Sequence, residues 1–169
     1  LQDIKDILIL QKREIEAIFK EKYVERNQSL KLNNNLIKVI IGPRRAGKSF
    51  FSIHFLSKHG NFGYINFDDE RLVNIENYDE IITSINSVYK NPKFILFDEI
   101  QNLPKWELFV NRLQRQGNNL VITGSNSNLL SKELATHLTG RHSSTSIFPF
   151  SFKEYLNLEE KNMTKTEIK

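Results

Sequence analysis

The chain has 169 residues, a net charge of +4 and no cysteine. This length suits one domain, and the lack of cysteine excludes disulfide scaffolds, thiol chemistry and cysteine zinc sites. The mild positive charge permits a nucleic acid as partner without requiring one. Because no apolar run is long enough to cross a bilayer and no signal peptide opens the chain, we expect a soluble, cytoplasmic protein without a membrane partner.

The chain begins with a helical pattern over residues 3–22, in which apolar side chains recur at helical spacing. A polar, asparagine-rich stretch over 27–35 predicts a connection. After it, short apolar runs alternate with helical patterns. We expect strands over 36–41, 63–67, 94–97, 120–123 and 144–148, and helices over 49–56, 81–89, from Pro104 toward Gly117, through 129–134, and from Ser151.

This alternation predicts an α/β fold, a three-layer α/β/α sandwich around a mainly parallel five-stranded sheet. In such sheets, ligands bind beyond the carboxyl ends of the strands. Several polar residues directly follow a predicted strand, which places them at that edge: the loop over 42–49, Asp68, Asp98, Glu99 and Ser125. The sequence therefore predicts a single site there.

A phosphate-binding loop follows the first strand. Its residues, with the one behind them, are Gly42, Pro43, Arg44, Arg45, Ala46, Gly47, Lys48, Ser49 and Phe50. Backbone amides of such a loop and the positive end of the next helix bind phosphates, while the lysine neutralises charge and the serine hydroxyl binds Mg²⁺. The two loop arginines either contact the nucleotide or lie exposed, with only their backbone taking part. We expect ATP, ADP and Mg²⁺ as ligands.

An acidic pair, Asp98-Glu99, ends the third strand in chain order. The aspartate is expected to hold Mg²⁺ through a water, and the glutamate to orient or deprotonate the attacking water. This pair favours an ATP hydrolase over a small-molecule kinase. GTPases are disfavoured because neither a D-x-x-G after the loop nor an N-K-x-D motif occurs. The strand at 63–67, between the loop strand and the acidic strand in sequence, fits the additional-strand glutamate division of P-loop proteins.

Three further positions carry two interpretations each. Ser125, after the fourth strand, either senses the γ-phosphate or caps a helix. Arg141 is either an arginine finger that stabilises transition-state charge or a surface arginine. The acidic turn over 68–70 either assists the metal or is a solvated turn.

The order of these motifs resembles the prokaryotic AAA-like ATPases of archaea and bacteria. The resemblance rests on the phosphate loop, Tyr64-Ile-Asn-Phe-Asp-Asp69, Phe97-Asp-Glu-Ile-Gln101 with Trp106, Ile122-Thr-Gly-Ser125, Leu138-Thr-Gly-Arg141 and Phe148-Pro-Phe-Ser-Phe-Lys-Glu-Tyr155. It implies a P-loop NTPase core of the AAA+ type. In that core Lys48 and Ser49 serve phosphate and magnesium, Asp98 the metal, Glu99 the water and Ser125 the sensor role; Gln101 falls near the site.

The resemblance also implies an organisation for the chain. We expect an N-terminal helix and connection over 1–30, the ATPase domain over 31–157, and in 158–169 a tail or the start of a C-terminal region. A DNA or protein partner would bind through that region. Self-association of the chain is a further possibility. The leading hypothesis is an ATPase core of a motor or switch; the alternative is a nucleotide-regulated binding module with slow turnover.

Overall fold

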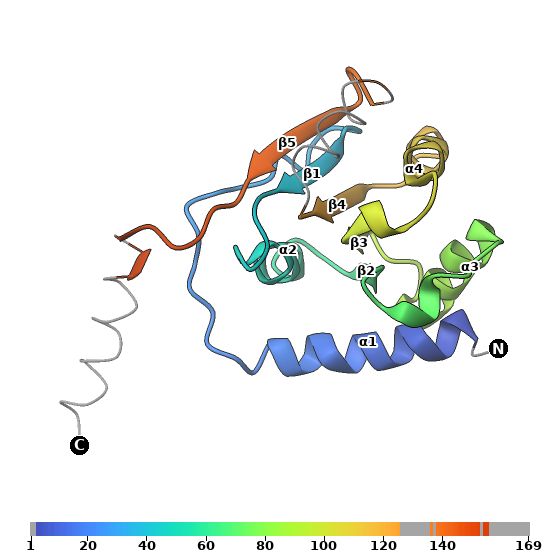
Figure 1. The fold of residues 1–169 in the computed structure, drawn as a ribbon, viewed down its shortest axis with the longest axis horizontal. Coiled ribbons are helices and arrows are strands. Elements are labelled where there is room, and N and C mark those ends of the chain that lie inside the picture. The colour runs from blue at the N-terminus through green and yellow to red at the C-terminus, as the bar shows by residue number, and fades with distance from the viewer. Residues whose placement is uncertain (1–2, 126–135, 137, 153, 156–169) are drawn as a thin grey trace.

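The computed structural model describes residues 3–125, 136, 138–152 and 154–155. Its centre is one sheet of five strands in the order β2-β3-β4-β1-β5, and every adjacent pair is parallel (Figure 1). The strands are β1 (Ile37–Ile41), β2 (Phe62–Asn66), β3 (Phe94–Asp98), β4 (Leu120–Gly124) and β5 (His142–Ser146). The strands from β1 to β4 are almost wholly buried, as near-continuous apolar runs in a parallel sheet should be.

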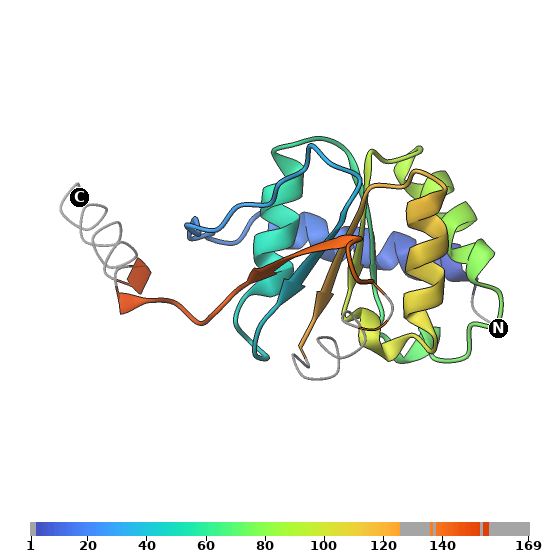
Figure 2. The same cartoon turned by 90° about the horizontal axis from the view of Figure 1, so that it is seen from above.

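Helices cover both faces of this sheet, so the predicted three-layer sandwich is confirmed. They are α1 (Ile4–Ile18), α2 (Lys48–Ser57), α3 (Tyr78–Tyr89) and α4 (Trp106–Arg115), with short 3₁₀ turns η1 (Glu70–Leu72) and η2 (Ile100–Asn102). Helix α2 lies on one face, and α3 and α4 lie on the other (Figures 1 and 2). Helix α1 lies beside β2 and packs on α3. None of the helices in the described ranges is long and apolar enough to span a membrane.

The strand that separates the loop strand from the acidic strand is β4. The parallel register pairs Val39 of β1 with Ile122 of β4, and Phe97 of β3 with the same Ile122. The strand at 62–66, on which the sequence argument relied, instead forms the edge beside β3. The predicted sheet division is correct, but a different strand produces it, because chain order does not reveal the order in space.

Some element boundaries differ from the expected ones. The last strand lies two residues earlier than predicted, because it pairs with β1 from Ile37–His142 to Ile41–Ser146. Its residues are polar and only partly buried, so the apolar pattern pointed to the residues that follow it. The first helix ends at Ile18, and the helix expected from Pro104 begins at Trp106. The helix expected through 129–134 lies outside the described residues.

After β5 the chain continues as a C-terminal arm, residues 147–152 and 154–155, which extends away from the sheet (Figure 2). The Ser151 amide and hydroxyl both donate to Glu154 at 2.8 Å, and the Glu154 amide donates to the serine hydroxyl at 3.3 Å. This reciprocal capping box starts a helical turn where one was predicted. The arm is fixed to the connection before β1, since Arg26 pairs with Glu154 at 3.2 Å.

Candidate functional site

The predicted phosphate-binding loop joins the carboxyl end of β1 to the first turn of α2. Gly47 precedes the helix with φ of 85°, in the left-handed region that glycine adopts without steric penalty. The Phe51 amide donates to the Gly47 carbonyl at 2.9 Å, which closes the first turn. The amino end of a ten-residue helix therefore faces the loop, and its amides and dipole favour an anion.

The first glycine of the loop is required by close packing. A Cβ atom on Gly42 would lie 1.9 Å from the carbonyl oxygen of Ile147, in the C-terminal arm. The Ile147 amide donates to the Ile41 carbonyl at 2.8 Å, so strand, loop and arm are held together. A larger residue at position 42 cannot fit without moving the arm backbone, a reason for glycine that the sequence did not supply.

Lys48 lies inside the loop with only 4% of its surface exposed. Its Nζ donates to the Pro43 carbonyl at 3.0 Å and lies 3.8 Å from Glu99 Oε1. The ammonium group is thus held between the loop backbone and the acidic turn. This is where a charge that neutralises bound phosphates is needed.

Asp98 ends β3 and is 2% exposed. Its carboxylate accepts a hydrogen bond from the Tyr64 hydroxyl at 2.9 Å and another from the Thr123 hydroxyl. Burial raises the pKa of the Asp98 carboxyl, while hydrogen bonds from Thr123, Ser49 and Tyr64 act in the opposite direction. A buried carboxylate of this kind is best stabilised in its charged form by a nearby cation.

Glu99 follows directly and has a left-handed backbone, with φ of 50°. Its amide donates to the Thr123 hydroxyl at 3.0 Å. Its Oε2 accepts from the Ser125 amide at 3.1 Å and from Gln101 Nε2 at 2.6 Å, while Oε1 faces Lys48. The structure therefore brings Lys48, Asp98, Glu99 and Ser125 together at one edge of the sheet.

The donor set at this edge fits magnesium. Ser49 and Asp98 supply two neighbouring oxygens, since the serine side chain is close enough to the carboxylate to lower its pKa. Within the described residues, no group of three or more His, Cys, Asp or Glu side chains is placed to hold a metal by itself. Mg²⁺ in nucleotide sites usually takes one or two protein oxygens and completes its shell with waters and substrate phosphates.

Other acidic and basic residues near this edge have local partners or face solvent. The side chains of Arg44 and Arg45 are exposed, and so is Asp68. Asp69 pairs with Arg71 at 2.7 Å, and the hydrogen bonds from Arg71 lower the pKa of the Asp69 carboxyl to about 2. Within the acidic turn, Asp69 thus forms an ion pair and is only partly exposed, while Asp68 and Glu70 face solvent.

Arg141 does not lie at this edge. Its carbonyl accepts from the Ile37 amide at 2.9 Å, at the amino end of β1, whereas the phosphate loop follows the carboxyl end. Five strand residues separate these ends by roughly 13 Å. The Arg141 side chain is directed to Asn111 of α4, with Nη1 and Oδ1 3.3 Å apart. It therefore does not contact the loop of its own chain.

A cavity of about 250 Å³ opens beside the amino end of α2. It is lined by Lys22, Tyr23, Val24, Arg26, Gly47, Phe50 and Phe150. The Arg26 guanidinium lies over the Phe150 ring, 4.7 Å from its centroid, which fixes the arm against the connection. The Tyr23 ring also stacks on His54, with 3.9 Å between ring centroids. The result is an aromatic recess that shares Gly47 with the phosphate loop.

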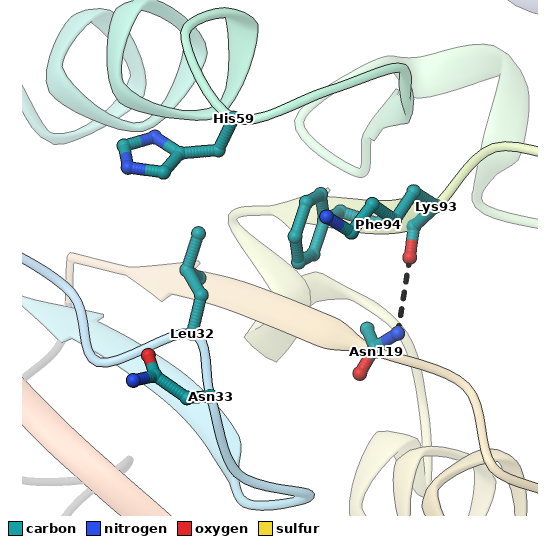
Figure 3. Close-up of a pocket in the computed structure, with 6 residues that line it drawn as sticks. All are labelled: Leu32, Asn33, His59, Lys93, Phe94 and Asn119. Atoms are coloured by element: carbon teal, nitrogen blue, oxygen red, sulfur yellow. Dashed lines mark hydrogen bonds between the residues drawn. The ribbon is translucent and has the colours of Figure 1, made fainter.

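A second cavity, of about 270 Å³, lies near the amino ends of the strands, away from the phosphate loop (Figure 3). Its lining includes Phe94, the first residue of β3, and Asn119, which precedes β4 and donates to the Lys93 carbonyl at 3.2 Å. These residues mark the amino ends of the strands. This cavity is therefore separate from the phosphate loop.

Two features of the site escaped the sequence interpretation. Tyr64, whose hydroxyl donates to Asp98, is predicted as part of a strand and of a family motif but is given no role at the site, although a hydroxyl within a buried apolar run is a usable signal. The aromatic recess combines Tyr23, Phe50 and Phe150, which are far apart in the chain. No local pattern reveals that these side chains meet.

Comparisons with known proteins agree with this architecture. Residues 34–156 match the model of a family described as an AAA domain. An uncharacterised protein of the archaeon Methanocaldococcus jannaschii is 46% identical over 155 residues, which cover 89% of this chain and 35% of that protein. An uncharacterised protein of the bacterium Haemophilus influenzae is 36% identical over 151 residues, covering 83% of this chain and 38% of that protein. The chain thus spans little more than a third of these curated relatives.

Proposed function

Because the chain belongs to the AAA domain family, whose model matches residues 34–156, we propose that it binds ATP with Mg²⁺ and hydrolyses it, as the ATPase core of a motor or switch. The observation that carries the proposal is the convergence of Lys48, Asp98 and Glu99 beyond the carboxyl ends of β1 and β3. If Lys48 and Glu99 formed only a structural ion pair, the chain would have no need of a glycine-rich anion-binding loop beside them.

The chain's own residues divide the chemistry among them. The loop amides and Lys48 bind the β- and γ-phosphates, and Ser49 and Asp98 hold Mg²⁺, which supplies charge neutralisation at the phosphates. Glu99 lies beside Lys48, so its Oε1 is close to where the γ-phosphate ends. From there it accepts a proton from the attacking water or orients that water. The Ser125 backbone amide donates a hydrogen bond to the Glu99 carboxylate and helps to orient it.

The aromatic recess is the place that we propose for the nucleobase. It adjoins the phosphate loop at Gly47, and base stacking on an aromatic side chain contributes about 1–3 kcal/mol. Phe150→Ala should therefore weaken ATP binding by about 5- to 150-fold. Binding of inorganic tripolyphosphate, which occupies the loop alone, should not change. Isothermal titration with both ligands measures the difference.

Phe148→Ala is the matched control for this experiment, because Phe148 lies in the same arm, is 61% exposed and does not line the recess. It should bind both ligands as the unmodified chain does. If Phe150→Ala weakens tripolyphosphate as much as ATP, the arm supports the loop and the recess does not read the base.

We further propose that Arg141 acts on the nucleotide of a neighbouring copy of the chain. Its exposed side chain and its place at the amino end of β1 support action in trans over action in cis. Phosphate release per molecule should then rise with protein concentration. Two inactive variants, Arg141→Ala and Glu99→Gln, should regain activity when mixed, because an intact arginine then faces an intact glutamate.

Phosphate release is to be measured across protein concentration and during titration of one variant into the other. Activity per molecule that stays constant over the whole range, with no recovery in the mixture, would reject the trans role. The same assay run with DNA addresses the alternative, a nucleotide-regulated and DNA-associated binding module. That alternative predicts tight ATP-dependent DNA binding with little turnover.

A further inference from the structure

Gln101 lies where the acidic turn meets the end of β4. It is the middle residue of η2. Its Nε2 donates to Glu99 Oε2 at 2.6 Å and also bonds the Ser125 hydroxyl at 3.4 Å. The Ser125 amide donates to the same glutamate oxygen at 3.1 Å. One oxygen of the Glu99 carboxylate is thus held by donors from two elements, while the other faces Lys48 at 3.8 Å.

The backbone of Glu99 makes such support necessary. With φ of 50° and ψ of 46°, it occupies the left-handed region that residues with a side chain seldom adopt. Conformations of this kind persist where neighbouring contacts determine them, and they gather at functional sites. The amide of Glu99 is held by Thr123, but that bond leaves the side-chain torsions free. The carboxylate is oriented by Gln101 and Ser125.

The side-chain amide of Gln101 acts as a hydrogen-bond donor toward Glu99 and Ser125. Its Nε2 makes both described hydrogen bonds, and its Oε1 is buried without a hydrogen-bond partner among the described residues. The hydrogen bonds of the Nε2 group therefore set the orientation of the glutamine side chain, which points this group toward Glu99. A residue present only to anchor the 3₁₀ turn would bond through the side chain to that turn's backbone, and no such bond is found in the described part of the chain.

We infer that Gln101 is a positioning residue for Glu99, a role that rests on the proposed function. It holds Oε2, so that Oε1 is the oxygen that meets the attacking water. When ATP phosphates bind Lys48, Oε1 is released from that contact while Oε2 keeps both of its donors. The carboxylate then keeps its direction at the step in which it is needed.

Two variants of Gln101 separate positioning from packing. Gln101→Met keeps the length of the side chain and removes the donor; Gln101→Glu keeps size and polarity but places a like charge beside Glu99. Both should lower kcat by about 10- to 100-fold, less than the roughly 10²- to 10⁴-fold that a positioned general base supplies. In Gln101→Met, KM and the Kd for ATP should stay within about twofold, because the phosphate contacts are unchanged and no charge is added.

Asn102→Ala is the matched control, since Asn102 lies on the same 3₁₀ turn and its exposed side chain bonds Asp68 at 3.2 Å. It should keep the kcat of the unmodified chain. Steady-state kinetics, ATP titration and a melting curve are recorded for each variant; if the methionine variant does not fold, the glutamate variant decides. A folded variant with unchanged kcat, or with a raised KM at constant kcat, would overturn this inference and leave the proposed function standing. Absence of hydrolysis by the unmodified chain overturns the proposed function together with it.

Discussion

Glu99→Gln is expected to keep ATP bound and to lose almost all turnover. The amide is isosteric, and its carbonyl oxygen still accepts from the Ser125 amide and Gln101 Nε2, so the fold and the loop are preserved. What is lost is the carboxylate that accepts or orients a proton of the attacking water. General-base contributions of this kind are about 10²–10⁴-fold, and kcat should fall by that factor. Phosphate release and ATP titration measure the two quantities.

Glu70→Gln is the control for this substitution. Glu70 is the exposed first residue of η1, and its removal changes the net charge by the same amount. It should leave both kcat and the Kd for ATP unchanged. A Glu99→Gln variant that hydrolyses ATP at the original rate would remove the glutamate from the mechanism.

Lys48→Ala is expected to weaken ATP binding and to abolish turnover. The Nζ is buried between the Pro43 carbonyl and Glu99, whereas the side chains of the other two loop cations, Arg44 and Arg45, are exposed. A hydrogen bond to a charged group contributes about 1.5–3 kcal/mol, and the Kd for ATP should rise by about 10- to 150-fold. Turnover should fall below detection, because the lysine also stabilises the transition-state charge. Titration with ATP and tripolyphosphate should show the same loss for both ligands.

Lys58→Ala provides the comparison. Lys58 follows α2, the helix that Lys48 begins, and forms an exposed ion pair with Glu25. Exposed pairs contribute little, so this variant should bind ATP as the unmodified chain does. Equal ATP affinity in Lys48→Ala and Lys58→Ala would mean that the phosphates bind elsewhere.

The local part of this site could be predicted from sequence because its chemistry is contiguous. Gly42 to Ser49 run from the end of an apolar strand into the first turn of a helix, and Asp98-Glu99 stand at the end of a buried strand. Since parallel strands present their carboxyl ends at one edge, both stretches were expected to meet. The contact between Lys48 and Glu99 is in agreement with that expectation.

What depends on spatial order could not be predicted in the same way. The strand between β1 and β3 is β4, and no periodicity distinguishes a central strand from an edge one when both are apolar. The last strand is polar because it lies at the other edge of the sheet, so its start at His142 followed from pairing and not from composition. Arg141 sits one residue before that strand, and this register is what separates it from the loop.

The measurement that tests the account most directly is a single turnover with the chain in excess over γ-labelled ATP. Rapid quenching separates bound ATP from released phosphate, so slow steady-state turnover does not hide the chemistry. We predict that ATP binds and is converted to ADP and phosphate when Mg²⁺ is present, and is recovered intact when Mg²⁺ is chelated. Bound ATP that stays intact with Mg²⁺ would contradict hydrolysis and favour the binding module; no binding at all would contradict the phosphate loop itself.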